Sequence, residues 1–209
     1  MTAASAPRRL IVGITGATGI IYGVRALQVL RELGIESHLV VSKAGEMTRD
    51  YETDLSREQL QAMADVVHPI GDVGASIASG SFKTMGMLVA PCSVRTLAEV
   101  ATGVTSTLLT RAADVVLKER RKLILMVREA PLHAGHIRNM LAVTELGGII
   151  YPPVPAFYTR PHSVADIVDH SLGRAFDCFG IEMPGMPRWD GEHRRQPATT
   201  APNIAALKV

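Results

Sequence analysis

The chain has 209 residues, of which 47% are hydrophobic and 20% charged, a balance that suits one α/β domain with a sizeable buried core. A net charge of +2 and an aromatic content of 4% argue against a nucleic-acid partner or an anionic membrane. The two cysteines, Cys92 and Cys178, form no Cys-x-x-Cys pair, which favours the reducing cytoplasm, and residues 1–10 contain neither a signal peptide nor a transmembrane span.

Short apolar runs alternate with segments of helical spacing along the chain. The sequence predicts strands at residues 10–14, 37–42, 85–90, 123–127 and 148–151. It predicts helices at residues 20–33, 44–51, 56–63, 93–103, 106–119, 133–146 and 163–179. Strands that alternate with helices indicate a three-layer α/β domain, in which helices cover both faces of a parallel sheet.

No internal repeat or domain linker divides the chain. We expect a flexible N-terminus over residues 1–8, a single α/β domain over 9–182 and an extended C-terminal tail over 183–209. Loops are expected at 72–83 and at the proline-rich segment 152–161, and the strand that begins at Met85 is expected to end at Pro91.

The first strand leads into a glycine-rich turn and then into a helix. Gly13, Gly16 and Gly19 follow one another at three-residue spacing. Backbone N–H groups at such a helix start, together with the helix dipole, favour an anion such as the phosphate of a nucleotide or flavin. The spacing differs from G-x-G-x-x-G and no Lys-Ser/Thr pair follows, so a tight strand-to-helix turn without a ligand stays open as an alternative.

Two further turns follow strands at the same predicted edge of the sheet. Ser42 comes directly after the second strand, and the segment APCSVRT, residues 90–96, places Ser93 and Thr96 at the start of a helix. Simple N-capping explains Ser93 as well as ligand binding does. Because α/β sheets bind ligands at the carboxyl ends of their strands, the three turns together favour one site.

Cationic side chains gather near the middle of the chain. Arg111 and Lys118 are seven residues apart, so they share one face of their predicted helix. Arg128 and Glu129 directly follow a buried strand, and charged residues in that position indicate a site. The three cations between these pairs are interpreted as a solvated helix end: Arg120, Arg121 and Lys122.

Other polar residues give weaker signals. Tyr158 and Arg160 in the proline-rich loop, with Arg174 in the last helix, could hold a second phosphate, although Arg174 alone is typical of a surface residue. No acidic cluster for a magnesium diphosphate occurs, and His133 and His136 lack a third ligand, so no metal site is expected. Cys92 is interpreted as a small buried thiol rather than a nucleophile.

Several blocks of the sequence resemble the UbiX-type flavin prenyltransferases. In chain order, from about Arg9 to Trp189, the blocks are ITGATGIIYG, VSKAG, ETD, SGSF, APCSVRTLAEVATG, LLTRAADVVLKERRKLIL, VREAPLH and PPVPAFYTRP. The resemblance implies a place in the wider group of homo-oligomeric flavin-containing decarboxylase-like proteins. It also implies a Rossmann/flavodoxin-like fold.

The resemblance implies a metal-independent enzyme that transfers a dimethylallyl group from dimethylallyl monophosphate to reduced FMN. The group would join flavin atom N5 and then C6. The product, prenylated FMN, is the cofactor of UbiD-type decarboxylases, which act in ubiquinone biosynthesis and in aromatic acid decarboxylation. The resemblance further implies a homo-oligomer, a dodecamer built from trimers, in which neighbouring subunits share the site.

The resemblance also gives each matching position an expected role. The residues that would meet the flavin are Gly16, Ala17, Thr18, Ser42, Ser93, Val94, Arg95, Thr96, Arg111 and Arg128. The residues that would hold or surround the dimethylallyl phosphate are Ser79, Gly80, Ser81, Lys118, Arg128, Glu129, Tyr158 and Arg174. Catalytic roles would fall to Thr18, Glu52, Lys118 and Glu129, with Glu52 near the reacting edge of the flavin.

The sequence departs from the family pattern at one position, where the usual Gly-Ala-Ser-Gly is Gly-Ala-Thr-Gly. Thr18 keeps the hydroxyl and adds a methyl group beside the flavin. Three other functions stay open: an FMN-dependent cysteine-type decarboxylase of the same fold, a non-enzymatic flavin-carrier subunit of an aromatic-acid decarboxylase, and a direct aromatic-acid decarboxylase. The lack of a Pro-Ala-Ser-Ala-Asn-Thr run argues against the first, and the set of phosphate-binding residues argues against the second.

Overall fold

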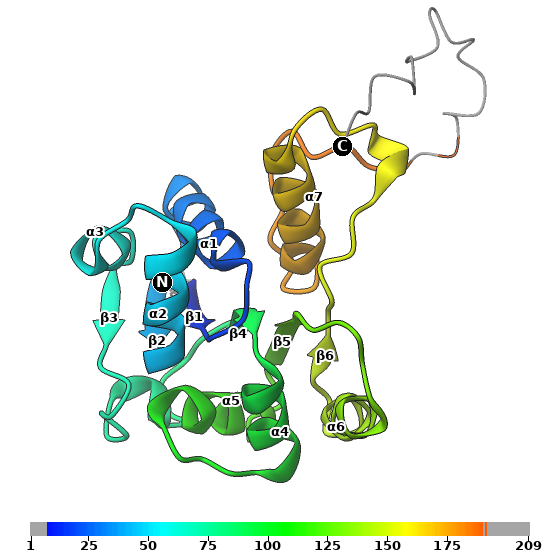
Figure 1. Ribbon diagram of the computed structural model, residues 1–209. Helices are drawn as coiled ribbons and strands as arrows, with labels where there is room; N and C mark the ends of the chain where they lie inside the picture. The colour runs from blue at the N-terminus through cyan, green and yellow to red at the C-terminus, as the bar shows by residue number, and fades with distance from the viewer. Residues whose placement is uncertain (1–7, 190, 192–209) are drawn as a thin grey trace, which may run out of the picture.

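The computed structural model describes residues 8–189 and 191 (Figure 1). Six parallel strands form one sheet in the order β3-β2-β1-β4-β5-β6. The strands are β1 (Arg9–Ile14), β2 (Glu36–Val41), β3 (Val66–His68), β4 (Gly86–Cys92), β5 (Lys122–Val127) and β6 (Ile149–Ile150). The parallel sheet confirms the predicted α/β fold. All of the expected flexible N-terminus except residue 8, and most of the expected tail, lie outside the described residues.

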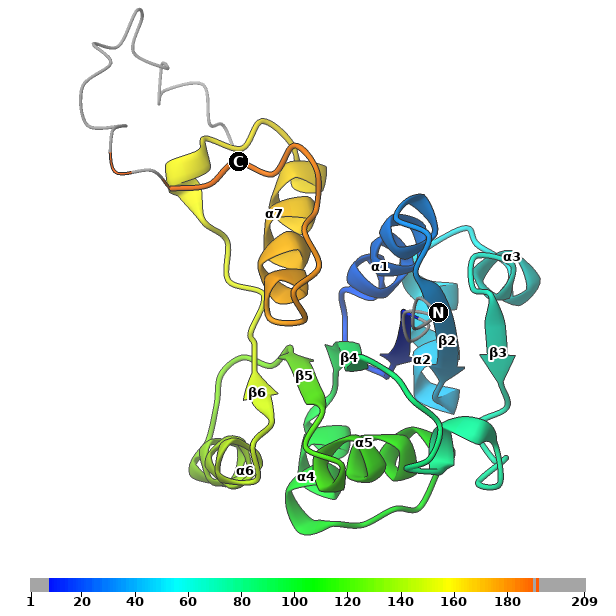
Figure 2. The same ribbon diagram turned by 180° about the vertical axis from the view of Figure 1, so that it is seen from behind.

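Helices cover both faces of the sheet. They are α1 (Ile20–Glu32), α2 (Lys43–Glu52), α3 (Arg57–Gln61), α4 (Val94–Thr102), α5 (Leu108–Lys118), α6 (Ala134–Glu145) and α7 (Val164–Asp177). Figures 1 and 2 show α1, α3 and α7 on one side of the sheet and α4, α5 and α6 on the other, which is the predicted three-layer arrangement. No helix among the described residues is both long and apolar enough to cross a membrane.

Two strands differ from the sequence prediction. The sequence pattern misses β3 because it has only three residues and ends in a histidine, which gives no apolar run. Strand β4 continues through Pro91 to Cys92 instead of ending at Pro91. The pairing of β4 with β5 shifts register between Val89 and Cys92, and proline is tolerated in a strand at such an irregularity because no regular ladder bond from its nitrogen is needed there.

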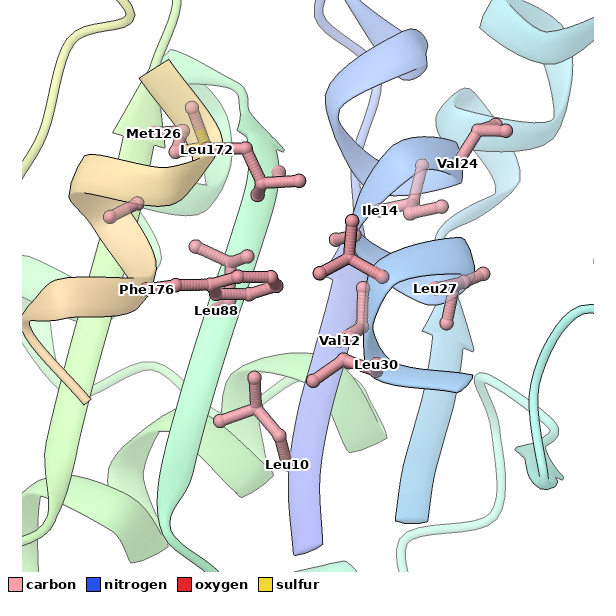
Figure 3. Close-up of a cluster of buried hydrophobic side chains, with 14 of the residues drawn as sticks. Leu10, Val12, Ile14, Val24, Leu27, Leu30, Leu88, Met126, Leu172 and Phe176 are labelled. Carbon is pink, nitrogen blue, oxygen red and sulfur yellow. The ribbon is translucent and has the colours of Figure 1, made fainter. Parts of the chain in front are cut away.

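The core on the α1 side joins that helix and α7 to the centre of the sheet. Figure 3 shows Phe176 of α7 lying against Leu88 of β4, and Leu30 of α1 lying beside Val12 of β1. Phe176 is fully buried. Gly23 of α1 is needed for this packing, because a Cβ atom at that position would lie only 2.4 Å from the carbonyl oxygen of Ala90. Two packed helices therefore hold the carboxyl ends of β1 and β4 in place.

Candidate active site

The turns after β1, β2 and β4 meet at the carboxyl edge of the sheet, as the sequence predicts. Thr15 is 1% exposed, and its hydroxyl donates to the carbonyl oxygen of Pro91 at 2.8 Å and accepts from the N–H of Ser93 at 2.8 Å. The N–H of Ser42 donates to the carbonyl oxygen of Ile14 at 2.9 Å. These bonds fix the three turns relative to one another.

A cavity of about 440 Å³ lies between the starts of α2 and α4. Ser42 Oγ accepts from the N–H of Gly45 at 3.0 Å, and Ser93 Oγ accepts from the N–H of Thr96 at 3.2 Å, so both serines cap their helices. The earlier N–H groups of each helix have no partner within the helix, and two positive dipole ends converge on the cavity. The arrangement favours an anionic group, with Lys43 in the cavity wall.

Half of the residues expected at the flavin line this cavity. They are Gly16, Ser42, Ser93, Arg95 and Thr96. Ile70, Val73 and Leu109 add an apolar wall. The side chain of Arg95 is 81% exposed and its Nε lies 2.9 Å from Glu99 Oε1. The cavity lining within the described part of the chain does not include the other five expected residues: Ala17, Thr18, Val94, Arg111 and Arg128.

The turn at Gly16 passes close to the start of α2. A Cβ atom at Gly16 would lie 2.3 Å from the Cβ of Ala44, so Gly16→Ala must push the turn and α2 apart at the mouth of the cavity. We expect this substitution to weaken FMN binding at least about tenfold and to lower stability by about 1–3 kcal/mol. Fluorescence titration of FMN and thermal denaturation measure the two effects.

The matched control for Gly16→Ala is Gly74→Ala. A Cβ at Gly74 would have ordinary contact with Asp72 Oδ1 at 3.6 Å, and Gly74 does not line the cavity. The control is expected to bind FMN like the unmodified protein. If Gly16→Ala also bound FMN with unchanged affinity, the cavity between α2 and α4 would not be the flavin site.

A carboxylate of the chain itself occupies the start of α1. Glu52 Oε2 accepts from the N–H groups of Gly19 at 2.8 Å and of Ile20 at 3.0 Å. Partial burial raises the pKa of Glu52, but bonds from the Thr18 hydroxyl and the two backbone amides, together with the charge of Arg128, outweigh burial and leave the pKa below its ordinary value. The glycine-rich turn therefore holds an internal anion, where the sequence indicates a phosphate.

Arg128 and Glu129 follow β5, and the charge of Arg128 acts on the carboxylate of Glu52. The N–H of Arg128 donates to the carbonyl oxygen of Cys92 at 3.1 Å, which anchors the end of β5 to the end of β4. Glu129 Oε1 accepts from the N–H of Ala130 at 3.0 Å. Cys92 itself is fully buried and burial raises the pKa of its thiol, in agreement with its interpretation as a buried thiol.

Lys118 lies at the opposite end of the sheet. It ends α5, four residues before β5 begins, and its Nζ would be 2.8 Å from a Cβ atom at Gly80. The hydroxyls of Ser79 and Ser81 are 2.9 Å apart in the same loop. Lys118 pairs with Glu119, and Arg111, seven residues earlier in α5, pairs with Asp114 at 2.7 Å.

The prediction that Arg120, Arg121 and Lys122 form a solvated helix end is wrong for Arg121. Its side chain is 13% exposed, and its guanidinium donates to the carbonyl oxygen of Phe82 at 2.7 Å and to that of Gly80. These bonds hold the 79–82 loop next to Lys118. Arg120 is exposed with a positive φ of 56°, and Lys122 is exposed, which agrees with the prediction for those two.

Tyr158 and Arg174 form a separate group of expected site residues. Tyr158 lies in the loop before α7, and Arg174 lies in α7. The hydroxyl of Tyr158 lies 3.0 Å from Nε2 of His170 in α7. Arg174 is one helical turn beyond His170, and its Nη1 donates to Asp177 at 2.6 Å. Within one chain, the expected substrate residues therefore lie in three separate places: the carboxyl edge near Glu52, the 79–82 loop with Lys118, and the region of α7.

Three positions that support these groups are not among the residues predicted from the sequence. Thr15 and His170 bond directly to expected site residues, and Lys43 lines the cavity. Thr15 lies in the glycine-rich turn and Lys43 lies at a helix start, so the sequence holds a weak indication that each is near the site. His170 gave none, because its partner is 12 residues away across a loop.

No group of three or more His, Cys, Asp or Glu side chains within the described ranges is arranged to hold a metal ion. His133 instead caps α6, since its Nδ1 accepts from the N–H of Gly135 at 3.0 Å. Its ring stacks on that of His136, with the two centroids 3.6 Å apart.

The chain matches one family model and is similar to several known proteins. The family model described as Flavoprotein matches residues 2–175. A protein of Neisseria meningitidis serogroup B named flavin prenyltransferase UbiX is 60% identical over 184 residues, which cover 88% of this chain and 97% of that one.

Two solved structures have the same fold at high sequence identity. The crystal structure of AnUbiX (PadA1) in complex with FMN and dimethylallyl pyrophosphate has a TM-score of 0.87 and 48% identity, over 89% of this chain and 99% of that one. A dodecameric FMN-dependent UbiX-like decarboxylase of Escherichia coli O157:H7 has a TM-score of 0.85 and 50% identity, over 88% and 100% of the two chains.

Proposed function

Because the chain belongs to the UbiX-type flavin prenyltransferases of the flavoprotein family, we propose that it transfers a dimethylallyl group from dimethylallyl monophosphate to N5 and C6 of reduced FMN. The proposal is carried by two features at the carboxyl edge of the sheet: a cavity between two helix starts, and a carboxylate, Glu52, whose pKa is lowered by the hydrogen bonds it accepts. The first feature suits a flavin phosphate, and the second suits proton removal near the flavin.

The residues of the cavity fit FMN. Its volume of about 440 Å³ lies within the range of small-molecule sites. Two helix starts with Lys43 provide for a phosphate, the hydroxyls of Ser93 and Thr96 provide polar contacts, and Leu109 belongs to an apolar wall against which a ring can lie. Reduced FMN, when bound, supplies the electron-rich atoms that accept the prenyl group.

Fixed cations of this chain would stabilise the leaving phosphate. When the carbon–oxygen bond of the donor breaks, negative charge develops on the phosphate, and a monophosphate leaves poorly without assistance. Lys118, Arg128 and Arg174 carry fixed positive charge, and Tyr158 offers a hydroxyl donor. These groups can supply the charge that a metal ion would otherwise provide, so the reaction is expected to proceed in the presence of a chelator.

Carboxylates near the carboxyl edge would accept the proton that ring closure releases. Glu52 is held ionised by Thr18, by two backbone amides and by Arg128. Thr18 contacts this carboxylate, so its hydroxyl can pass a proton to it, as a serine in the same place would. Glu129, next in the chain to Arg128, is the second candidate acceptor.

The separation of Lys118 from Glu52 supports a homo-oligomer in which neighbouring copies complete each site, and we infer a dodecamer. The solved dodecamer at 50% identity supports this assembly. The two free cysteines support a reducing, cytoplasmic location. The product would serve a UbiD-type decarboxylase, in ubiquinone biosynthesis or aromatic acid breakdown.

A coupled assay tests the proposed function. The protein is incubated anaerobically with reduced FMN and dimethylallyl monophosphate in the presence of EDTA, and the released flavin is added to a UbiD-type apo-decarboxylase together with the aromatic carboxylic acid that this decarboxylase acts on. We expect carbon dioxide release that depends on both substrates, and a parallel reaction with the diphosphate compares the donors. Carbon dioxide release by the protein alone would favour the direct decarboxylase, and no activation with either donor would contradict the proposal.

A further inference from the structure

His170 is a buried imidazole that the proposed reaction does not use directly. It lies in α7, is 8% exposed and stands one turn before Arg174 on the same helix face. Its Nε2 is 3.0 Å from the hydroxyl oxygen of Tyr158, and the two rings meet edge to face with centroids 5.6 Å apart. Trp189 packs edge to face on the same tyrosine ring, with centroids 5.5 Å apart.

The direction of the bond between Tyr158 and His170 decides what the tyrosine can do. A tyrosine hydroxyl has one proton to donate. If Nε2 of His170 accepts that proton, the hydroxyl has none left for a substrate. If Nε2 carries the hydrogen and donates it to the phenolic oxygen, the hydroxyl proton stays free for a phosphate oxygen. The two arrangements predict opposite effects when the imidazole is removed.

The surroundings of His170 favour the neutral form of its imidazole. Burial lowers its pKa, the charge of Arg174 lowers it further, and Asp177 opposes these effects only in part. A neutral imidazole carries one N–H group, so a fixed tautomer can hold the tyrosine in one orientation. The exposed fraction of Tyr158 is 43%, whereas that of His170 is 8%, so a substrate can reach the tyrosine more readily than the imidazole.

We propose that His170 is a positioning residue for the prenyl donor: its Nε2–H donates to the oxygen of Tyr158 and directs the tyrosine proton toward the substrate phosphate beside Arg174. This inference rests on the proposed function, in which Tyr158 and Arg174 hold that phosphate. It concerns donor binding only, because the FMN cavity lies at the starts of α2 and α4 and does not include α7.

Steady-state kinetics on the full-length protein test the inference. His170→Phe fills the same space without a donor and is expected to raise KM for dimethylallyl monophosphate about tenfold, the loss typical of one hydrogen bond to a charged group. The Kd for FMN is expected to stay near that of the unmodified protein, because His170 does not line the FMN cavity. His170→Gln, whose amide can donate from the place of Nε2, should restore KM, whereas the shorter His170→Asn should not.

A double-substitution cycle shows whether His170 acts through Tyr158. Tyr158→Phe alone should raise KM by a similar factor, and adding His170→Phe to it should change KM little further. His162→Phe is the matched control: it lies in the loop that precedes α7, where its backbone N–H, not its ring, bonds to Asp166 at 2.8 Å. The control should leave KM unchanged.

The results of these experiments distinguish a failure of the proposed function from a failure of the role proposed for His170. An inactive unmodified protein would overturn the proposed function and this inference with it. An unchanged KM in Tyr158→Phe would remove the tyrosine from the donor site, and with it the role of His170. A raised KM in Tyr158→Phe together with an unchanged or lowered KM in His170→Phe and His170→Asn would overturn this inference alone and leave the proposed function standing.

Discussion

Lys118→Ala is expected to lower kcat/KM for dimethylallyl monophosphate by about 100-fold, because a fixed cation that stabilises a leaving phosphate typically contributes two to three powers of ten. The same substitution should leave FMN binding intact, since Lys118 does not line the FMN cavity. Lys122→Ala, which removes a nearby exposed lysine, is the matched control and should keep full activity. Initial rates over a range of donor concentrations measure the effect.

Mixed oligomers can recover the activity that Lys118→Ala loses. Lys118 precedes β5 and Arg128 follows it, and a strand of six residues spans roughly 20 Å, too far for both side chains of one copy to reach a single phosphate. If neighbouring copies share each site, co-expression of Lys118→Ala with Glu52→Gln should give active sites in about a quarter of positions by random assortment. Mixed oligomers that bind FMN but show no recovered activity would contradict the shared site.

Glu52→Gln is expected to lower kcat by about 100-fold, as the loss of a general base does. The glutamine oxygen can still accept the N–H groups of Gly19 and Ile20, so the start of α1 stays bonded and the substitution removes mainly charge and basicity. Glu46→Gln is the matched control on the same helix, where Glu46 pairs with Arg49 and Arg57. Normal prenylation at both flavin positions by Glu52→Gln would remove this residue from the mechanism.

The lowered pKa of Glu52 also fixes the sign of a pH effect. Its carboxylate is bonded more strongly in the folded than in the unfolded protein, so its contribution to stability is fully present above the ordinary glutamate pKa. That contribution is lost as the pH falls through the lowered pKa of the folded state. Acid denaturation of Glu52→Gln should therefore depend less on pH in that range than acid denaturation of the unmodified protein.

Much of the fold follows from local patterns in the sequence. The apolar runs in β1, β2, β4 and β5 indicate buried parallel strands, and the helical spacing of α1 and α5 is clear. The third strand and the last part of β4 could not be predicted, because β3 is three residues long and Pro91 ordinarily ends a strand. These two errors concern segments where tertiary pairing, rather than local sequence, decides the structure.

The turns that form the candidate site could be predicted from the sequence, but the long-range hydrogen bonds of its side chains could not. Ser42, Ser93 and Gly16 follow strands, so their meeting at one edge follows from the parallel sheet. The bond of Arg121 to Gly80, 41 residues away, has no local signal in a run of charges. The same holds for Glu52 at the start of α1, since sequence spacing cannot show which anion of the chain reaches a helix start 32 residues earlier.

The mass of the flavin released after an anaerobic reaction tests the central claim most directly. The purified protein is mixed with reduced FMN and dimethylallyl monophosphate without added metal, and the protein is then denatured to release the flavin. The account predicts a flavin heavier by one five-carbon unit, formed only when both substrates are present. Unmodified FMN from a protein that binds FMN, alongside a known prenyltransferase that gives the heavier product, would contradict the account.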